Sequence, residues 1–146
     1  MKLSTRARYA ARALTEIALG YPGGTITAKD VAERQGISAK YLEQLLASLK
    51  AAGLVKAIRG ARGGFALARP PEDITLKQVL EVLEGSVAPV ECVDHPESCP
   101  MKDICPTRDT WVDVRNAVES VLGNTTLLDL VRRRRAKLSS AQMYHI

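Results

Sequence analysis

The chain has 146 residues, about the length of one domain, and its 46% hydrophobic and 25% charged residues are typical of a soluble globular protein. No apolar run approaches the roughly 20 residues that a membrane-spanning helix needs. The first residues also lack the apolar centre of a secretion signal. We therefore expect a cytoplasmic protein without a membrane partner.

The net charge of +5 is unevenly distributed along the chain. Residues 1–70 carry 12 Lys and Arg against 4 Asp and Glu, whereas residues 71–131 carry 4 against 12. Five further cations follow in the last 15 residues. A basic half of this kind predicts a polyanionic partner, of which double-stranded DNA is the most common.

The N-terminal half has the pattern of a helix-turn-helix. Apolar residues recur at three and four positions over 4–19, which predicts an amphipathic helix. A short helix over 28–34 and a longer one over 38–52 follow, each preceded or begun by a Thr or Ser that can cap it. A turn containing Gly36 separates the two, as in helix-turn-helix motifs.

A β-hairpin is predicted directly after these helices. Residues 54–59 and 65–68 favour strands, and three glycines make 60–64 a flexible tip. A hairpin in this position defines a winged helix. A helix over 75–84 follows, where Thr75 and Gln78 have the spacing of a capping box.

The rest of the chain predicts a loop and two helices. Residues 85–106 are rich in Pro and Cys and predict no regular structure. An amphipathic helix is expected over 108–122 and a last one over 126–135, with a frayed tail after it. We interpret the arginine run at 132–135 as a solvated helix end.

The fold class is therefore mostly α with a small β-hairpin wing. We expect three parts: a winged helix-turn-helix DNA-binding domain (1–84), a cysteine-rich cluster-binding loop (85–106), and a dimerisation helix with a C-terminal helix or tail (107–146).

Two groups of residues are candidates for contact with DNA. In a helix-turn-helix the second helix enters the major groove with its N-terminal residues. Glycines at the hairpin tip would let arginines reach the narrow minor groove. The candidates are Ser38, Lys40, Tyr41, Glu43 and Gln44 on the helix, and Arg59 and Arg62 on the wing.

The three cysteines of the chain, Cys92, Cys99 and Cys105, lie within fourteen residues, with His95 between the first two. An odd number of cysteines in a cytoplasmic chain favours a metal or redox site over disulfides. Thiolates suit zinc, copper(I) or an iron–sulfur cluster. A Cys3His zinc site using His95 is one alternative. A thiol or metal enzyme is a weaker one, because no paired carboxylate or Ser/His arrangement accompanies the cysteines, and we expect no enzyme.

The amphipathic helix over 108–122 is a candidate dimerisation helix. Trp111, Val114, Val118 and Val121 lie on one side of it. Such an apolar stripe needs a partner, and a second copy of the chain would supply it. A two-fold homodimer would bind a pseudo-palindromic DNA operator.

The whole pattern resembles one known family. The stretches 3–20, 33–38, 41–45 and 55–65, the last with its Arg-Gly-x-x-Gly-Gly tip, are similar to the Rrf-two-type winged-helix regulators. The similarity is strongest to the IscR-like iron–sulfur cluster regulators, and it extends to the three-cysteine loop and the helix after it.

This resemblance implies a homodimeric transcription regulator whose three cysteines hold an iron–sulfur cluster, [2Fe–2S] in the IscR-like members. It also implies that Glu43 helps to discriminate between classes of DNA site, and that the cluster controls genes of cluster biogenesis or related genes. IscR-like proteins have a histidine ligand where this chain has Arg108. The fourth ligand is therefore open between His95, a carboxylate of Glu91, Asp103 or Asp109, and an external thiol or water.

Overall fold

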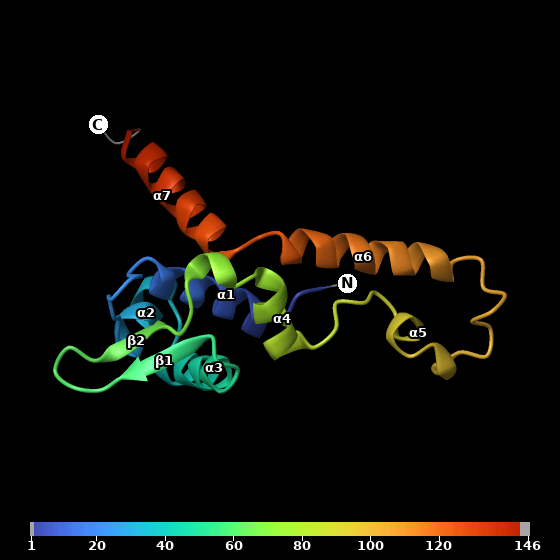
Figure 1. The fold of residues 1–146 in the computed structure, drawn as a ribbon, viewed down its shortest axis with the longest axis horizontal. Helices are drawn as coiled ribbons and strands as arrows, with labels where there is room; N and C mark the ends of the chain where they lie inside the picture. The colour runs from blue at the N-terminus through green and yellow to red at the C-terminus, as the bar shows by residue number, and fades with distance from the viewer. Residues whose placement is uncertain (1, 144–146) are drawn as a thin grey trace.

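The computed structural model describes residues 2–143 (Figure 1). Its elements, in chain order, are α1 (Thr5–Ala18), α2 (Ala28–Gln35), α3 (Ala39–Ala51), β1 (Val55–Ile58), β2 (Gly64–Leu67), η1 (Pro71–Asp73), α4 (Leu76–Glu84), α5 (Glu91–Asp94), η2 (Pro96–Ser98), α6 (Arg108–Gly123) and α7 (Leu127–Met143). The predicted fold class, mostly helical with one hairpin, is confirmed. No helix in the described residues is long and apolar enough to span a membrane.

The helix-turn-helix forms from local signals. The Thr27 side chain accepts a hydrogen bond from the backbone N–H of Asp30 at the start of α2, and Ser38 accepts one from Tyr41 at the start of α3. Gly36 ends α2 in the left-handed conformation, with a φ of 68°, which a residue with a side chain rarely adopts. The predicted caps and turn are confirmed.

The wing is an antiparallel hairpin in which Val55 lies opposite Leu67. Ile26, in the segment before α2, pairs with the second strand of this hairpin. It exchanges two backbone hydrogen bonds with Phe65, at 2.8 and 3.1 Å. The wing is thus fixed to the entrance of α2. Its position relative to the helix-turn-helix follows from backbone hydrogen bonds as well as from packing.

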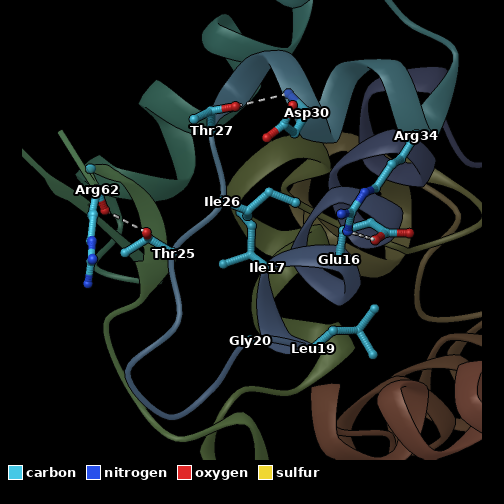
Figure 2. A pocket seen from close by; sticks show the side chains of 11 residues that line it. Glu16, Ile17, Leu19, Gly20, Thr25, Ile26, Thr27, Asp30, Arg34 and Arg62 are labelled. Carbon is cyan, nitrogen blue, oxygen red and sulfur yellow. Dashed lines mark hydrogen bonds and ion pairs between the residues drawn. The ribbon is translucent and has the colours of Figure 1, made fainter.

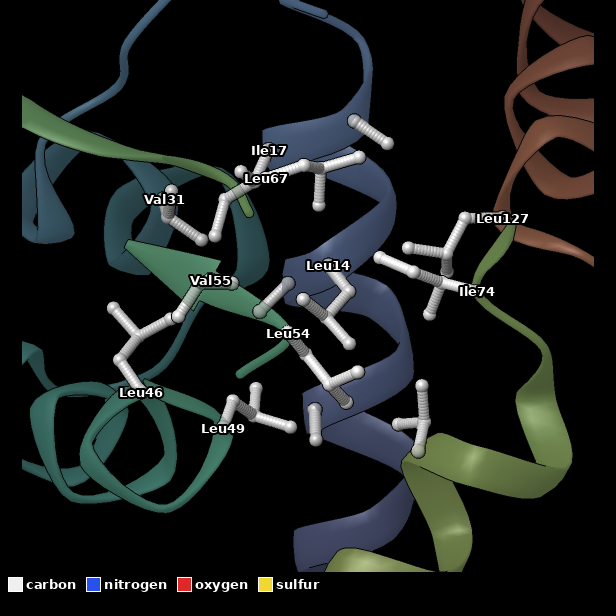
Figure 3. Close-up of a cluster of buried hydrophobic side chains, with 14 of the residues drawn as sticks. Leu14, Ile17, Val31, Leu46, Leu49, Leu54, Val55, Leu67, Ile74 and Leu127 are labelled. Atoms are coloured by element: carbon white, nitrogen blue, oxygen red, sulfur yellow. The ribbon is translucent and has the colours of Figure 1, made fainter. Parts of the chain in front are cut away.

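The hydrophobic core lies between α1, α3, the hairpin and the start of α4 (Figure 3). Leu14 and Ile17 of α1 meet Leu46 and Leu49 of α3 in the same cluster, and all four are at most 2% exposed. Leu127 at the start of α7 is also fully buried in this cluster. The core therefore joins the N-terminal helix to the last helix of the chain.

A second set of contacts joins α4 to α7. The backbone N–H of Leu76 donates to the Thr125 carbonyl and that of Leu127 to the Ile74 carbonyl, both at 2.9 Å. The capping box of Thr75 and Gln78 is confirmed. Between these points the chain runs outward through α5 and returns along α6, which extends away from the winged helix (Figure 1).

Two predictions for the C-terminal half were wrong. Residues 85–106 contain the short helices α5 and η2, and η2 begins at Pro96, whose fixed φ suits the first helical position. The tail after residue 135 is not frayed as far as the structure describes it, because α7 continues to Met143. Residues 144–146 of the predicted tail lie outside the described residues.

A buried carboxylate joins three helices. Glu16 of α1 has a side chain that is only 2% exposed. Its Oε1 accepts from the Gln35 amide nitrogen at 3.0 Å and lies 2.8 Å from an Arg134 guanidinium nitrogen. Its Oε2 lies 3.4 Å from Arg34. Because a buried charge is stable only when it is paired, α2 and α7 are both held to α1 at this point.

The interpretation of the arginine run as a solvated helix end was therefore wrong in one respect. The run lies in the first half of α7, and Arg134 turns inward to Glu16. All four arginines are exposed at least in part, and Arg134 is the one that pairs with Glu16. The sequence does not indicate which of the four arginines is paired, because they are identical and only one of the four positions faces the carboxylate.

We predict that Glu16→Ala lowers the free energy of unfolding by about 3 kcal/mol, the lower end for a broken buried ion pair, because Arg34 and Arg134 are themselves about half exposed. Glu33→Ala is the matched control, since Glu33 is exposed on α2, and should change stability by less than about 0.5 kcal/mol. Urea unfolding followed by circular dichroism measures both. Equal stabilities of the two variants would contradict this role of Glu16.

Candidate nucleic-acid interface and cysteine loop

The predicted recognition face is the solvent side of α3. Lys40, Glu43 and Gln44 are exposed, and Tyr41 is half buried, while the leucines of the opposite face are buried. The Ser38 oxygen accepts the capping hydrogen bond, and its hydroxyl proton remains to donate. The helix therefore presents donors and acceptors of several kinds in one place, as base readout requires.

A chain of side chains positions this face and was not predicted from the sequence. The Tyr41 ring packs edge-on against Tyr9 of α1, with centroids 6.2 Å apart. The Arg12 guanidinium lies 5.2 Å from the Tyr9 ring, and its Nε donates to the Gln35 side-chain oxygen at 2.6 Å. Tyr9 and Arg12 lie off the apolar stripe of α1, but the sequence does not indicate which helix they face.

The wing tip carries Arg59 and Arg62, both exposed. The Thr25 hydroxyl donates to the Arg62 carbonyl at 2.8 Å, which anchors the tip to the loop before α2. A side chain at Gly63 would collide with the Ile58 carbonyl oxygen, so the tight return of the hairpin requires glycine there. The two arginines thus project from a supported tip.

A pocket of about 410 Å³ lies between the wing, α2 and the end of α1 (Figure 2). Asp30 and Arg34 of α2 line it together with Arg62 of the wing, and Glu16 lies at its inner side, paired with Arg34. The charges of the pocket are mixed, which distinguishes it from the uniformly basic surface that DNA phosphates require.

The three cysteines lie on the segment that connects the winged helix to α6. Cys92 is in α5, Cys99 follows η2, and Cys105 precedes α6 by three residues. All three are free and partly buried. An ion pair of 3.9 Å between Arg115 and Asp94 holds α5 against α6. The three thiols therefore all lie on the segment between α4 and α6.

Hydrogen bonding stabilises one thiolate. The Thr107 hydroxyl lies 3.3 Å from the Cys105 sulfur, and the backbone N–H groups of Thr107 and Arg108 also point to it. These contacts lower the pKa of the Cys105 thiol below its ordinary value, because they favour the charged sulfur. His95, in contrast, is exposed, with its Nδ1 3.3 Å from a Glu97 oxygen.

Arg108 occupies a special position between two cysteines. One guanidinium nitrogen lies 3.5 Å from the Cys92 carbonyl oxygen, and its backbone N–H points to Cys105. Its Nε is buried and has no hydrogen-bond partner. Within residues 2–143, no group of three or more His, Cys, Asp and Glu side chains is gathered to hold a metal ion. The three thiols and His95 are therefore not gathered into one ligand set in the described residues.

The candidate dimerisation face of α6 is open to solvent. None of its residues is buried, Trp111 is 37% exposed and Val121 is 67% exposed. Val114 and Val118 are half buried. A shallow apolar hollow is lined by Ala117, Val118, Val121 and Leu122. This stripe has no partner in the rest of the described chain that covers it.

A helix-turn-helix followed by a hairpin wing, on a basic half of the chain, defines a winged-helix DNA-binding regulator. Residues 3–133 match the Rrf2 family model, described as an iron-dependent transcriptional regulator. The chain belongs to the Rrf2 family of transcriptional regulators. The predicted family resemblance is confirmed.

The comparisons with individual proteins agree with this membership. The chain is 43% identical over 132 residues to protein rrf2 of Nitratidesulfovibrio vulgaris, covering 90% of this chain and 88% of that one. The structure of CymR, described as the global cysteine regulator of B. subtilis, is 40% identical with a TM-score of 0.80, covering 91% and 98% of the two chains. The structure of T. potens IscR is 39% identical with a TM-score of 0.77, covering 92% and 88%. Relatives are named as transcriptional regulators, in agreement with a non-enzymatic role.

Proposed function

We propose that this protein is an iron–sulfur cluster-dependent transcription regulator of the cytoplasm, which binds pseudo-palindromic operator DNA as a homodimer. Its target genes would be those of cluster biogenesis or related genes. The observation that carries the proposal is the set of three free cysteines, the only ones in the chain, on the segment between the DNA-binding domain and α6. The iron dependence in the description of the matching family supports it.

The residues of the loop fit an iron–sulfur cluster by their chemistry. Thiolates are the usual ligands of such clusters, and we assign Cys92, Cys99 and Cys105 this role, with a [2Fe–2S] cluster. The buried, unpartnered Nε of Arg108 is a donor that an anionic cluster could satisfy. Arg108 has no lone pair to offer, so the fourth ligand is another group, for which His95 is our candidate.

A bound cluster would supply a charge at this loop that changes with iron and oxidation state. The effect of this charge would be transmitted by the protein residues that contact the loop. The loop follows α4, which packs on α1, and α5 packs on α6. Any tightening of the loop around its ligand therefore acts on the dimer helix and on the DNA-binding domain at once.

The homodimer rests on α6. The stripe of Trp111, Val114, Val118 and Val121 lies on an arm that extends away from the winged helix (Figure 1). Exposed apolar stripes of this length are stable when they pack against a second copy. Each copy would then present one α3 and one wing to a half-site of the operator.

On DNA, we assign sequence readout to the α3 residues Ser38, Lys40, Tyr41 and Gln44, with Glu43 discriminating between sites. The exposed Arg59 and Arg62 would hold the minor groove and its phosphates.

Cysteine substitutions test the cluster. We predict that Cys92→Ala, Cys99→Ala and Cys105→Ala each abolish the absorption between about 320 and 460 nm that iron–thiolate charge transfer produces in anaerobically purified protein. Circular dichroism should remain unchanged, because the three residues lie outside the core. Ser98→Ala, on the same loop, should retain colour and iron. A colourless wild-type protein containing zinc would contradict the proposal.

Charged substitutions test the dimer. The double variant Val114→Asp, Val118→Asp should sediment as a monomer and lose DNA affinity, because two carboxylates would be buried in the interface. Asn116→Asp, Ser120→Asp adds the same charge to the opposite side of α6 and should remain dimeric. Dimers of equal stability in both variants would overturn the role of α6.

Salt titrations test whether the wing supplies affinity for DNA and α3 supplies sequence discrimination. Arg59→Ala or Arg62→Ala should weaken binding to all duplexes and reduce the log–log salt slope by about 0.9 for each phosphate that is no longer neutralised. Gln44→Ala should cost about 1–3 kcal/mol at preferred sites and little on random DNA. Lys102→Ala removes one charge from the cysteine loop and serves as the control. An unchanged slope in the wing variants would refute their assignment.

A further inference from the structure

A basic cleft lies between α1 and α7, outside the predicted DNA-reading residues. It has a volume of about 290 Å³ and is lined by Arg12, Thr15, Gln35, Leu130, Arg133, Arg134 and Lys137. Nothing in the proposed function uses the cations of α7. The cleft exists because α7 continues past residue 135 and is held against α1.

Most cations of the cleft have no ion-pair partner in the described residues. Arg134 pairs with Glu16, but Arg12, Arg133 and Lys137 form no salt bridge within residues 2–143. These three cations come from two helices and line one cavity. Holding like charges together is unfavourable unless an anion joins them.

The polar groups around these cations are already occupied. The Gln35 amide uses its oxygen on Arg12 and its nitrogen on Glu16, and the Thr15 hydroxyl donates to the Ala11 carbonyl. Gln35 thereby fixes the Arg12 guanidinium, which retains unused N–H donors. A ligand would be held by cationic donors alone, which suits an anion with several oxygens.

The nearest carboxylate of α7 is also occupied. Asp129 accepts from the backbone N–H of Thr126 at 2.9 Å, while its own N–H donates to the Thr126 hydroxyl oxygen. The pKa of Asp129 is lowered, first by hydrogen bonds that its carboxylate receives from the backbone and side chain of Thr126 and then by the field of Arg133 and Arg132. The Asp129 side chain is held by hydrogen bonds at the start of α7, and Asp129 does not line the cleft.

We propose that this α1–α7 cleft binds a phosphate group. Arginine and lysine donors converging from two sides are the usual environment of phosphate oxygens in proteins. The phosphate has two conceivable sources, the backbone of DNA that flanks the operator half-site and a free phosphate in solution. The DNA source rests on the proposed function, whereas the phosphate chemistry does not.

The position of the cleft favours flanking DNA. Gln35 is the last residue of α2, directly before the helix-turn-helix turn, and Arg12 also contacts Tyr9, which packs on Tyr41 of the recognition helix. The cleft is therefore continuous with the side chains that support the DNA-reading face. A duplex longer than the operator would place further phosphates beside that face.

The test compares two double variants that lose the same charge from the same helix. Arg133→Gln, Lys137→Gln removes cations from the cleft, and Arg132→Gln, Arg135→Gln removes two exposed arginines that do not line it. The DNA is a duplex selected from a random library by the wild-type protein, used at its minimal length and with flanks of about ten further base pairs, roughly one helical turn. Anisotropy gives the affinity and the salt slope.

For the extended duplex, the log–log salt slope of the cleft variant should fall by about 0.9, because the one phosphate held in the cleft would no longer be neutralised, and the control variant should keep the wild-type slope. On the minimal duplex the two should agree. In the second arm, thermal unfolding is measured in inorganic phosphate against chloride at equal ionic strength. A phosphate-dependent rise of Tm that is absent only from the cleft variant, without a change of slope, identifies free phosphate as the source.

Both arms have an outcome that overturns the proposal. If the cleft variant matches the control in salt slope and in phosphate-dependent Tm, the cleft does not bind phosphate. If the wild-type protein selects no duplex, the proposed function fails, while the thermal arm still decides whether the cleft binds phosphate. The two failures are thus distinguishable.

Discussion

The arrangement of this protein depends on one buried carboxylate. Glu16 of α1 is removed from solvent, and its two oxygens are satisfied by α2 and α7 through Gln35, Arg34 and Arg134. An unpaired charge at this depth would be strongly unfavourable, so the three helices are required to meet there. Apolar packing alone would tolerate many helix orientations, whereas these polar contacts require one.

The positions of two candidate functional surfaces follow from that contact. Because α2 is fixed to α1, the turn at Gly36 directs α3 so that its leucines enter the core and its polar face remains in solvent. Because α7 is fixed through Arg134, its neighbours Arg133 and Lys137 face Arg12 across a cleft. One carboxylate, through two ion pairs, thus holds both α2, which leads into the candidate DNA-reading helix, and α7, which lines the basic cleft.

The cysteine loop connects the winged helix to the exposed helix α6. It leaves α4 of the winged helix and returns as α6, whose apolar side is exposed. In the proposed homodimer, a ligand held by this loop would act on the spacing of the two DNA-reading helices, because the loop connects the winged helix to α6. In this chain Arg108 contacts both the first and the last cysteine, through its side chain at the Cys92 carbonyl oxygen and through its backbone N–H at Cys105.

Elements whose signals are local could be predicted from the amino-acid order alone. The caps at Thr27, Ser38 and Thr75, the glycine turn and the hairpin were predicted, because each depends on residues within one or two turns of chain. The winged helix and the candidate DNA-reading residues followed from these elements. The grouping of the cysteines can be read directly from the sequence.

What each exposed or charged residue faces, in contrast, depends on packing between distant parts of the chain. The burial of Glu16, the Tyr9–Tyr41 contact and the unlike roles of neighbouring arginines on α7 join residues far apart in sequence. The periodicity of the sequence does not predict such pairs, since it does not distinguish a solvent-exposed glutamate on a helix from one that pairs with a distant guanidinium. The length of α7 was missed for the same reason, because a polar helix is stabilised here by contacts at its first turns rather than by its own pattern.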